Sequence, residues 1–289
     1  MFWLDDASTE MATVFDIADV CAVPDEPGMY HIKNALGKVL NKWSVQHYDP
    51  NELAQFLAVV ANQRLAALHG IYEIDATVTP VLLSPISQLG QDLWVLQVLN
   101  RRENGFFVDI GAGDGLLISN SYRLERDHKW LGIAVEPSRQ FEALKVNRKC
   151  CCLQTCISDK VETVTFVEDY LHGEHNHFSG IQKYADCHPQ QGKHTSMPTE
   201  TLAQVLRSQG APKTIDYLSI DTEGSELIIL SVFPFDEYIF RCITVEHNYV
   251  EPKRTQLHDL LVRNGYHRID LSATQWDDWY LHGSVMLET

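Results

Sequence analysis

Three glycines within five residues follow an apolar run in the stretch FFVDIGAGDGLLISN, residues 106–120. They are Gly111, Gly113 and Gly115. Because glycine has no Cβ, such a turn lets a ligand approach the backbone closely. A dinucleotide fingerprint requires the spacing G-x-G-x-x-G, and Leu116 stands where its third glycine would fall. Asp109 and Asp114 flank the turn, and their carboxylates would repel a pyrophosphate but attract a cationic amino-acid head.

Another acid, Glu136, ends the next strand-like segment, LGIAVEP at residues 131–137. A carboxylate in this position typically accepts hydrogen bonds from ribose hydroxyls. The two segments therefore indicate a nucleoside that carries a positive group instead of phosphates, which describes S-adenosylmethionine. Two alternatives remain: a glycine turn that only connects strand to helix, and an NAD site, which the glycine spacing disfavours.

Two later strand ends carry side chains suited to methyl transfer. This reaction is an in-line displacement, so the enzyme must align the nucleophile, exclude water and remove a proton. SIDTEGSE places Asp221, Glu223 and Glu226 after one strand, and VEHN ends the next strand with Glu246, His247 and Asn248. We expect Asp221, His247 and Glu223 to be catalytic, and Asn248 to contact the acceptor. For His247 the alternative roles are a metal ligand or a structural partner of a carboxylate, and for Glu223 a helix cap.

A divalent metal is an open question at the same strand ends. Asp221 with His247 and Asn248 resembles the layout of metal-dependent O-methyltransferases, where an acid and an Asp-Asn pair hold magnesium. Oxygen ligands suit Mg²⁺ or Mn²⁺, whereas a histidine shifts the preference toward Mn, Fe or Zn. The sequence therefore permits a metal at these three residues without predicting one.

The segment 171–194 is rich in histidine and is expected to be a long loop. Its histidines are His172, His175, His177, His188 and His194. The loop is either a solvated surface segment or a lid over the acceptor, with a metal cluster as a third interpretation. His177 and Ser179 are the candidates for acceptor contacts. Trp279, within DDWYLH at 277–282, either lines the acceptor pocket or packs in the core.

Strand-like and helical patterns alternate from residue 87 onward, which predicts an α/β domain with a mainly parallel sheet. The main expected strands are 106–110, 131–137, 215–221 and 241–248. The main expected helices are 91–100, 117–126, 141–148 and 199–210. In such sheets the ligand lies outside the carboxyl ends of the strands. The acids and polar residues named above should therefore meet at one edge.

Five ordered motifs resemble the FkbM family of methyltransferases. They are SQLGQDLWVL (87–96), GFFVDIGAGDGLLISNSYRLE (105–125), WLGIAVEPS (130–138), IDYLSIDTEGSELIIL (215–230) and ITVEHNY (243–249). The resemblance covers roughly residues 85–282. It implies a Rossmann-like class I methyltransferase fold, with a mainly parallel seven-stranded sheet flanked by helices, that uses S-adenosylmethionine. Family members methylate hydroxyl groups of macrolides and sugars, and some methylate a peptide side-chain nitrogen.

The resemblance also implies which residues surround the methionine part and the ribose of the cofactor. Those around the methionine part would be Asp109, Gly111, Gly113 and Asn120, and Glu136 would bind the ribose. The family commonly has Glu where this chain has Asp109, and either acid can accept the same hydrogen bonds.

Further positions follow from the same resemblance. Ser158 and Asp159 match the stretch that usually lies against adenine. Asp221 would reach the cofactor as well as the acceptor. Gln88 and Asp92 match an SQxGxD entry motif and would lie near the cofactor, with helix capping as the alternative.

Composition excludes several kinds of partner. The 289 residues carry a net charge of −16, and an acidic chain repels nucleic acid and anionic membranes. The sequence has no run of 18 apolar residues, and its first thirty residues lack Lys and Arg, which argues against a membrane span and a signal peptide. Three of the seven cysteines are adjacent, which indicates reduced thiols and a cytoplasmic protein.

Residues 1–80 lie outside the resemblance and form a predicted extension to a methyltransferase domain at 81–289. An N-cap at Asp49, Pro50 and a helical spacing of apolar residues predict an amphipathic helix that ends at Gly70. The extension could dimerise the chain, cover the cofactor or recognise a large acceptor. A homodimer is one assembly that it would support.

Together these patterns predict a methyltransferase that uses S-adenosylmethionine and acts on a hydroxyl of a natural product or sugar. The second interpretation is N-methylation of a peptide side chain, which demands more of the base because an amide nitrogen is a poor nucleophile. The third is a binding protein that keeps the cofactor fold without chemistry. The acids at the strand ends argue against this third interpretation.

Overall fold

The computed structural model describes residues 86–169, 179–184, 192–269 and 274–285, and the backbone of three strands between residues 17 and 44. The chain divides into two units, Met1–Leu89 and Gly90–Thr289. Among the described residues, no helix has the length and apolar character that a membrane span requires.

The N-terminal unit contains a three-stranded antiparallel sheet. Its strands are β1 (Ile17–Ala22), β2 (Met29–Asn34) and β3 (Val39–Ser44), in the order β1-β2-β3. The sequence patterns do not predict this sheet, and its register is irregular at Ile17/Asp19 and at Ile32/Lys33. The amphipathic helix predicted for 49–70 lies outside the described residues, so it stays a prediction, as do the roles of the extension.

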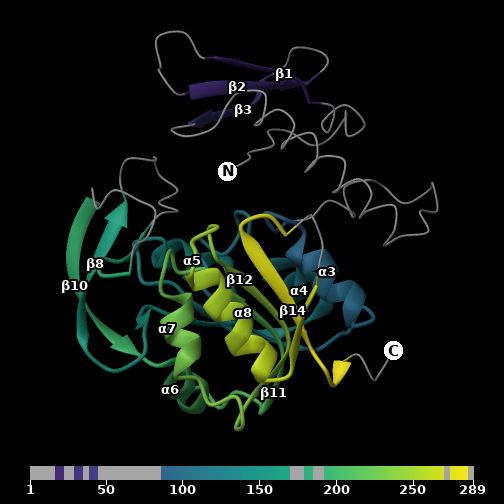
Figure 1. Cartoon of the computed structure of the whole chain (residues 1–289), viewed down its shortest axis with the longest axis vertical. Coiled ribbons are helices and arrows are strands. Elements are labelled where there is room, and N and C mark those ends of the chain that lie inside the picture. The colour runs from purple at the N-terminus through teal and green to yellow at the C-terminus, as the bar shows by residue number, and fades with distance from the viewer. Residues whose placement is uncertain are drawn as a thin grey trace. The chain divides into compact units, whose positions relative to one another are not determined.

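A seven-stranded sheet forms the centre of the second unit (Figure 1). From one edge to the other its order is β13-β14-β12-β11-β4-β5-β6. The strands are β4 (Phe106–Ile110), β5 (Leu131–Val135), β6 (Cys151–Leu153), β11 (Thr214–Ile220), β12 (Ile239–Glu246), β13 (Tyr266–Ile269) and β14 (Asp277–His282). All neighbouring pairs are parallel except those of β14, which is antiparallel to both β12 and β13. The predicted α/β fold with a mainly parallel seven-stranded sheet is confirmed.

The chain order of these strands creates a switch point at the centre of the sheet. From β4 the chain moves outward through β5 to β6, and it later returns to β11 on the other side of β4. Connections on the two sides of β4 therefore leave in opposite directions, and a crevice opens between them at the carboxyl ends. The fold thus places the glycine turn after β4 and the SIDTEGSE segment after β11 side by side.

Apolar residues explain why the central strands are buried on both faces. In β4, Phe107 and Val108 are fully buried, and the last six residues of β11 are all buried. Near-continuous apolar runs of this kind are typical of parallel strands that are covered by helices. The helices are α3 (Gln91–Val98), α4 (Tyr122–His128), α5 (Phe141–Asn147), α6 (Leu202–Ser208), α7 (Glu226–Ser231) and α8 (Lys253–Arg263). Contacts join α7 to α8 and α3 to α4 (Figure 1).

The structure corrects the expectation for the segment that precedes α6. Residues Gly192–Glu200 form a strand, β10, rather than the end of a loop and the start of a helix. β10 pairs antiparallel with β8 (Thr163–Asp169), and the two form a long ribbon beside the central sheet (Figure 1). The strand was missed because GKHTSMPTE is polar, contains a proline and is mostly exposed, so it lacks a two-residue apolar period. α6 starts only at Leu202, after Thr201 and Gln204 form a capping box.

Candidate functional site

The ends of β4 and β11 approach so closely that the first glycine of the turn is obligatory. The Gly111 N–H donates to the carbonyl of Val135 (2.9 Å), and the Asp221 N–H donates to the carbonyl of Ile110 (3.0 Å). A Cβ on Gly111 would lie 1.8 Å from the carbonyl oxygen of Asp221, and the φ of Gly111 is +86°. Glycine is therefore required here by the neighbouring backbone, in addition to any ligand.

Glu136, directly after β5, is held at the same edge by two backbone N–H groups. Its Oε2 accepts the Gly113 N–H (2.8 Å) and its Oε1 accepts the Ser138 N–H (2.8 Å). Burial raises the pKa of this carboxyl, while the hydrogen bonds from Ser138 and Gly113 oppose the shift. Each carboxylate oxygen can accept more than one hydrogen bond, so the fixed group still offers acceptor positions.

Asp114 shapes the turn instead of facing a ligand. Its Oδ1 accepts the N–H groups of Leu116 and Leu117, both at 2.8 Å. Ile118 follows with a φ of +47°. The helix expected at 117–126 therefore begins only at Tyr122, and an irregular loop precedes it.

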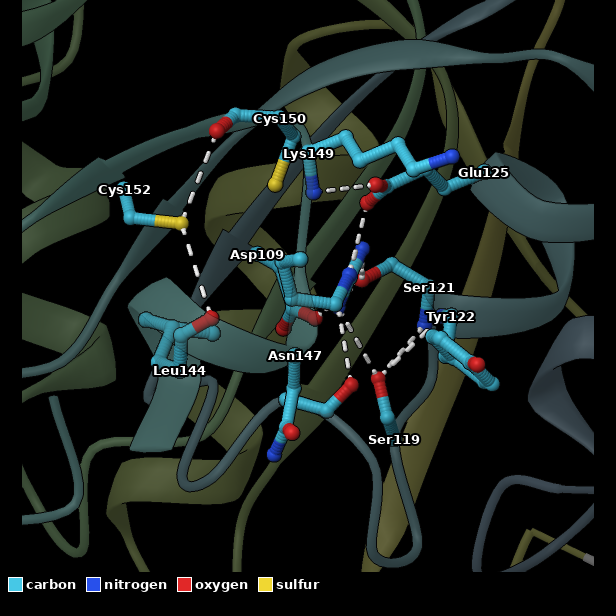
Figure 2. A network of polar contacts seen from close by, with 12 residues as sticks. Asp109, Ser119, Ser121, Tyr122, Glu125, Leu144, Asn147, Lys149, Cys150 and Cys152 are labelled. Atoms are coloured by element: carbon cyan, nitrogen blue, oxygen red, sulfur yellow. Dashed lines mark hydrogen bonds and ion pairs between the residues drawn. The ribbon is translucent and has the colours of Figure 1, made fainter. Parts of the chain in front are cut away.

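Asp109, in β4, belongs to a buried polar network that the sequence did not predict. Figure 2 shows the side chains of Ser119, Ser121 and Glu125 converging beside Asp109. Ser121 Oγ donates to Asp109 Oδ2. Burial raises the pKa of Asp109, and the hydrogen bond from Ser121 and the charge of Arg148 oppose this.

Arg148 is the cation of this network. Its side chain is fully buried and pairs with Glu125 at 2.6 Å. It also donates to Ser121 Oγ (3.0 Å), to Ser119 Oγ (3.3 Å) and to the carbonyl of Gly115 (3.3 Å). Arg148 therefore ties the glycine turn and the loop before α4 to the end of α5. Its only sequence signal is a basic residue at the end of an amphipathic helix, which does not identify its partners.

Asn120 presents an acceptor atom without a partner. Its Nδ2 donates to Ser219 Oγ (3.0 Å), whereas its Oδ1 is buried and accepts no hydrogen bond from the described residues. A buried amide oxygen usually has a donor. The ammonium group of an amino acid is a donor that would satisfy it, as expected for the methionine part of S-adenosylmethionine.

A small open cavity lies between these strand ends. Its wall includes Glu136 on one side and Asp221 on the other, with Cys156, Ile157 and Phe166 as an apolar surface between strands. An apolar surface beside a carboxylate fits a base and a ribose. The residues present therefore fit a nucleoside cofactor.

Ser158 and Asp159 lie directly after the apolar wall of this cavity. Ser158 is fully buried, and its hydroxyl donates to Asp159 Oδ1 at 3.0 Å. Ser179, one of the predicted acceptor contacts, lies in the cavity wall. His172, His175, His177 and His188 are outside the described residues, and His194 lies in β10 opposite Val167.

Acids crowd together where β11 and β12 end. Carboxylate oxygens of Asp221, Glu223 and Glu246 lie within 4.8 Å of one another. Burial, together with the charges of Asp277 and Glu226, raises the pKa of Asp221 to about 8. Burial and the neighbouring Asp221 raise the pKa of Glu246 well above its usual range. Glu246, which the sequence placed at this strand end without assigning it a role, is the last residue of β12.

The turn that carries Asp221 and Glu223 is braced by Glu226. Glu226 Oε1 accepts the N–H of Thr222 (2.9 Å), the hydroxyl of Thr222 (2.7 Å) and the N–H of Gly224 (3.0 Å). Lys253 pairs with Glu226 at 3.2 Å and donates to the carbonyl of Gly224. The bracing role at this helix start therefore belongs to Glu226, and Glu223 adopts a φ of +56° in the turn.

His247 is oriented differently from the expectation. The residue is 2% exposed, its Nδ1 accepts the N–H of Tyr249 (2.9 Å), and its Nε2 lies 3.6 Å from Asp278 Oδ1. This geometry favours the structural-partner alternative. His247 Nε2 makes no hydrogen bond with the described residues, so the possible metal-ligand set Asp221, His247 and Asn248 stays an open question. Its catalytic role stays a prediction.

Three other predicted positions have structural partners. Asp92 is fully buried and accepts a hydrogen bond from Arg123 Nε at 2.8 Å, which links α3 to α4. Gln88 is partly buried in the bend before α3. Trp279 is 3% exposed and packs on Trp94 with ring centroids 5.0 Å apart, which favours the core alternative. Neighbouring Gln91, which the sequence did not single out, donates to Asp277 at 2.9 Å.

The solved structures that match this chain carry methyltransferase names and share little sequence identity with it. The N-terminal domain of human METTL16 is 15% identical, with 87% of each chain covered and a TM-score of 0.39. A human methyltransferase 10 domain containing protein is 12% identical, with 78% of this chain and 96% of that chain covered and a TM-score of 0.37. Precorrin-6y C5,15-methyltransferase from Geobacter metallireducens is 12% identical, with 74% and 92% covered and a TM-score of 0.35. No curated protein matches the sequence.

The family comparison is more specific. The family profile described as the methyltransferase FkbM domain matches residues 109–268, which is more than half of the 289 residues. The match begins at Asp109 and includes Glu136, Asp221 and Glu246, which are the strand-end acids described above. The chain therefore belongs to the FkbM family of methyltransferases, enzymes that depend on S-adenosylmethionine.

Proposed function

We propose that this enzyme transfers a methyl group to a hydroxyl of a small molecule or sugar. The observation that carries the proposal is a cavity whose wall contains both Glu136 and Asp221. In this proposal one acid would bind the ribose of the cofactor, and the other would receive the proton of an acceptor.

Residues of the second unit can hold each part of S-adenosylmethionine. Glu136 would accept hydrogen bonds from the ribose, and the apolar wall of Cys156, Ile157 and Phe166 would contact the adenine. The free Oδ1 of Asn120 would accept a hydrogen bond from the ammonium group. Asp109, whose charge Arg148 offsets in part, would affect that ammonium group indirectly. Its hydrogen bond with Ser121 anchors the loop that carries Asn120.

S-adenosylmethionine supplies an electrophilic methyl carbon on a sulfonium sulfur. The acceptor oxygen forms a bond to this carbon while the carbon–sulfur bond breaks, and its electron pair stays on sulfur to give S-adenosylhomocysteine. The acceptor must also lose its proton. Asp221 is the candidate to receive it, because it lines the cavity. A pKa raised to about 8 makes its ionised form a strong base, and the share of that form grows as the pH rises toward 8.

The roles of Glu223 and His247 follow from their positions around Asp221. Glu223 carries a carboxylate beside Asp221 and would orient the acceptor. His247 would act indirectly, by fixing the end of β14 through Asp278. Ser179 would contact the acceptor from the other wall of the cavity.

A small acceptor agrees with the charge of the chain. The net charge of −16 would repel a nucleic-acid backbone, so we retain a small molecule, a sugar or a peptide as the acceptor class. The cytoplasmic location that the sequence indicates remains part of this proposal.

Calorimetric titration with S-adenosylhomocysteine tests the cofactor site. We expect the wild-type protein to bind, and Glu136→Gln to bind roughly tenfold to a hundredfold more weakly, since each hydrogen bond to a charged group contributes about 1.5–3 kcal/mol. Glu237→Gln, which removes one exposed acid far from the cavity wall, is the matched control. Equal binding by wild type and Glu136→Gln would contradict this placement of the ribose.

A product screen with methyl-labelled S-adenosylmethionine tests the acceptor class. An ether product from a sugar or polyketide hydroxyl would support the proposal. A methylated amide or amine would overturn it in favour of N-methylation. Asp221→Asn should keep most of the affinity for S-adenosylhomocysteine while turnover falls about 100-fold or more, as expected for loss of a proton acceptor.

A further inference from the structure

The acids that end β11 and β12 form a more compact set than a single proton acceptor requires. One oxygen from each of Asp221, Glu223 and Glu246 lies within 4.8 Å of the other two. Like charges this close repel each other strongly inside a protein, where water screens them poorly. Such a cluster needs a cation or bound protons to be stable as it stands.

A second observation concerns Glu246 alone. Glu246 is 7% exposed, and its Oε2 is fully buried with no hydrogen-bond partner among the described residues. A buried carboxylate oxygen is normally satisfied by a donor or a cation, because an unpaired one is costly. One carboxylate oxygen of Glu246 lies beside ligand atoms of Asp221 and Glu223, and neither of those carboxyls can donate a hydrogen bond while it is ionised.

The cations close to the cluster have carboxylate partners outside it. Lys253 lines the same small cavity as Glu223 and Glu246, where it pairs with Glu226 and donates to the carbonyl of Gly224. Arg254 pairs with Asp278 at 2.9 Å, and His247 faces the same carboxylate. The wall of this small cavity also includes Asn248, so the cluster borders a space next to the end of β12.

We propose that Asp221, Glu223 and Glu246 bind one hard divalent cation. The ligand set consists only of oxygens, which suits Mg²⁺, Mn²⁺ or Ca²⁺ rather than Zn²⁺ or Cu²⁺. The oxygen separations bear on which cation would fit. Two ligands of one ion can be at most about 4.6–5.2 Å apart around Ca²⁺ and about 4.0–4.2 Å around Mg²⁺. The limit of 4.8 Å on the separations is therefore nearer to the size of Ca²⁺, and Mg²⁺ would require the three carboxylates to move closer together.

The inference rests on the proposed function and deepens it. Asp221 lies in the wall of the cofactor cavity, so a cation at this cluster would be next to the acceptor. An acceptor oxygen that enters the coordination sphere would have its pKa lowered and its position fixed. Methylation would then favour acceptors with two adjacent oxygens, since such acceptors chelate a cation.

Mn²⁺ binding to the full-length protein tests the proposal without any assay of turnover. The protein is treated with chelator and titrated with Mn²⁺ alone, and free Mn²⁺ is measured by electron paramagnetic resonance. We expect one site, with affinity reduced at least about tenfold in Glu246→Gln. Glu223→Gln, which is less buried, repeats the test if Glu246→Gln does not fold. Glu237→Gln removes the same charge from an exposed ion pair and should bind Mn²⁺ as the wild type does.

Each outcome decides whether the cation site exists, independently of whether the cofactor site has been placed correctly. Absence of a site below about 1 mM, or equal binding by wild type, Glu223→Gln and Glu246→Gln, would overturn the cation proposal. Calorimetry with S-adenosylhomocysteine on the same samples reports the cofactor site independently. If Mn²⁺ binds at the cluster, it should also broaden the proton resonances of bound S-adenosylhomocysteine in the wild type and not in Glu246→Gln. Broadening that persists in that variant would place the ion elsewhere.

Discussion

Replacing Arg148 by methionine should destabilise the fold through the acid that it leaves behind. The Arg148 side chain is fully buried, and Glu125, its partner at 2.6 Å, is 11% exposed. Breaking a buried pair by removing one member costs about 3–5 kcal/mol, because the remaining charge is uncompensated. Arg148→Met should therefore lower the free energy of unfolding by that amount and the melting temperature by on the order of 10 °C.

Urea denaturation of four proteins measures the effect and its origin. They are the wild type, Arg148→Met, Glu125→Gln and the double variant. If the uncompensated Glu125 causes the loss, the double variant should recover about 2 kcal/mol or more relative to the sum of the single variants. Arg207→Met, which breaks an exposed pair with Glu237, should change stability little. A loss below about 1 kcal/mol in Arg148→Met, or strict additivity in the cycle, would refute this reasoning.

Two further predictions concern the glycine turn and the acids of β14. Gly111→Ala should destabilise the fold far more than Gly210→Ala and should abolish binding of S-adenosylhomocysteine. Both glycines have positive φ, but only at Gly111 would an added Cβ lie 1.8 Å from a backbone oxygen. Comparable denaturation midpoints for the two variants would contradict this prediction. Burial raises the pKa of Asp277 to about 6, so its ionised form is disfavoured in the fold and its stabilising contribution is lost as pH rises through 6. The free energy of unfolding of Asp277→Asn, measured relative to the wild type by urea titration, should therefore rise by about 1.4 kcal/mol between pH 5 and pH 8. A difference that does not change with pH would show that the Asp277 carboxyl is already ionised at pH 5.

The central sheet was predictable because its strands are buried on both faces. FFVDI and LGIAV became β4 and β5, and IDYLSI falls within β11. A strand that helices cover on both faces needs a nearly continuous apolar run, and this run is visible in the sequence whatever ligand the protein binds. The glycine turn and Glu136 were predictable for a related reason, since the chain must turn sharply at a fixed distance from each strand end.

Exposed and polar elements were not predictable in the same way. β10 carries Pro198 and mostly exposed side chains, so no periodic signal marks it. The loop 111–121 depends on Asp114 caps and on the contacts of Arg148, which join residues about 30 positions apart. Interactions over such sequence distances leave no local pattern, although they decide where the loop lies.

The choice between Glu246 and His247 shows how finely a site depends on where a strand ends. VEHN offers three polar residues in a row, and the sequence alone favoured the second and third. In the structure β12 continues through Glu246, which pairs with Asp277 in the ladder. Asn248 and Tyr249 then adopt positive φ, with values of +47° and +57°, and this turn directs the His247 ring toward Asp278. Because adjacent residues of a strand face opposite sides, one residue of register separates an acid beside Asp221 from an imidazole that supports β14.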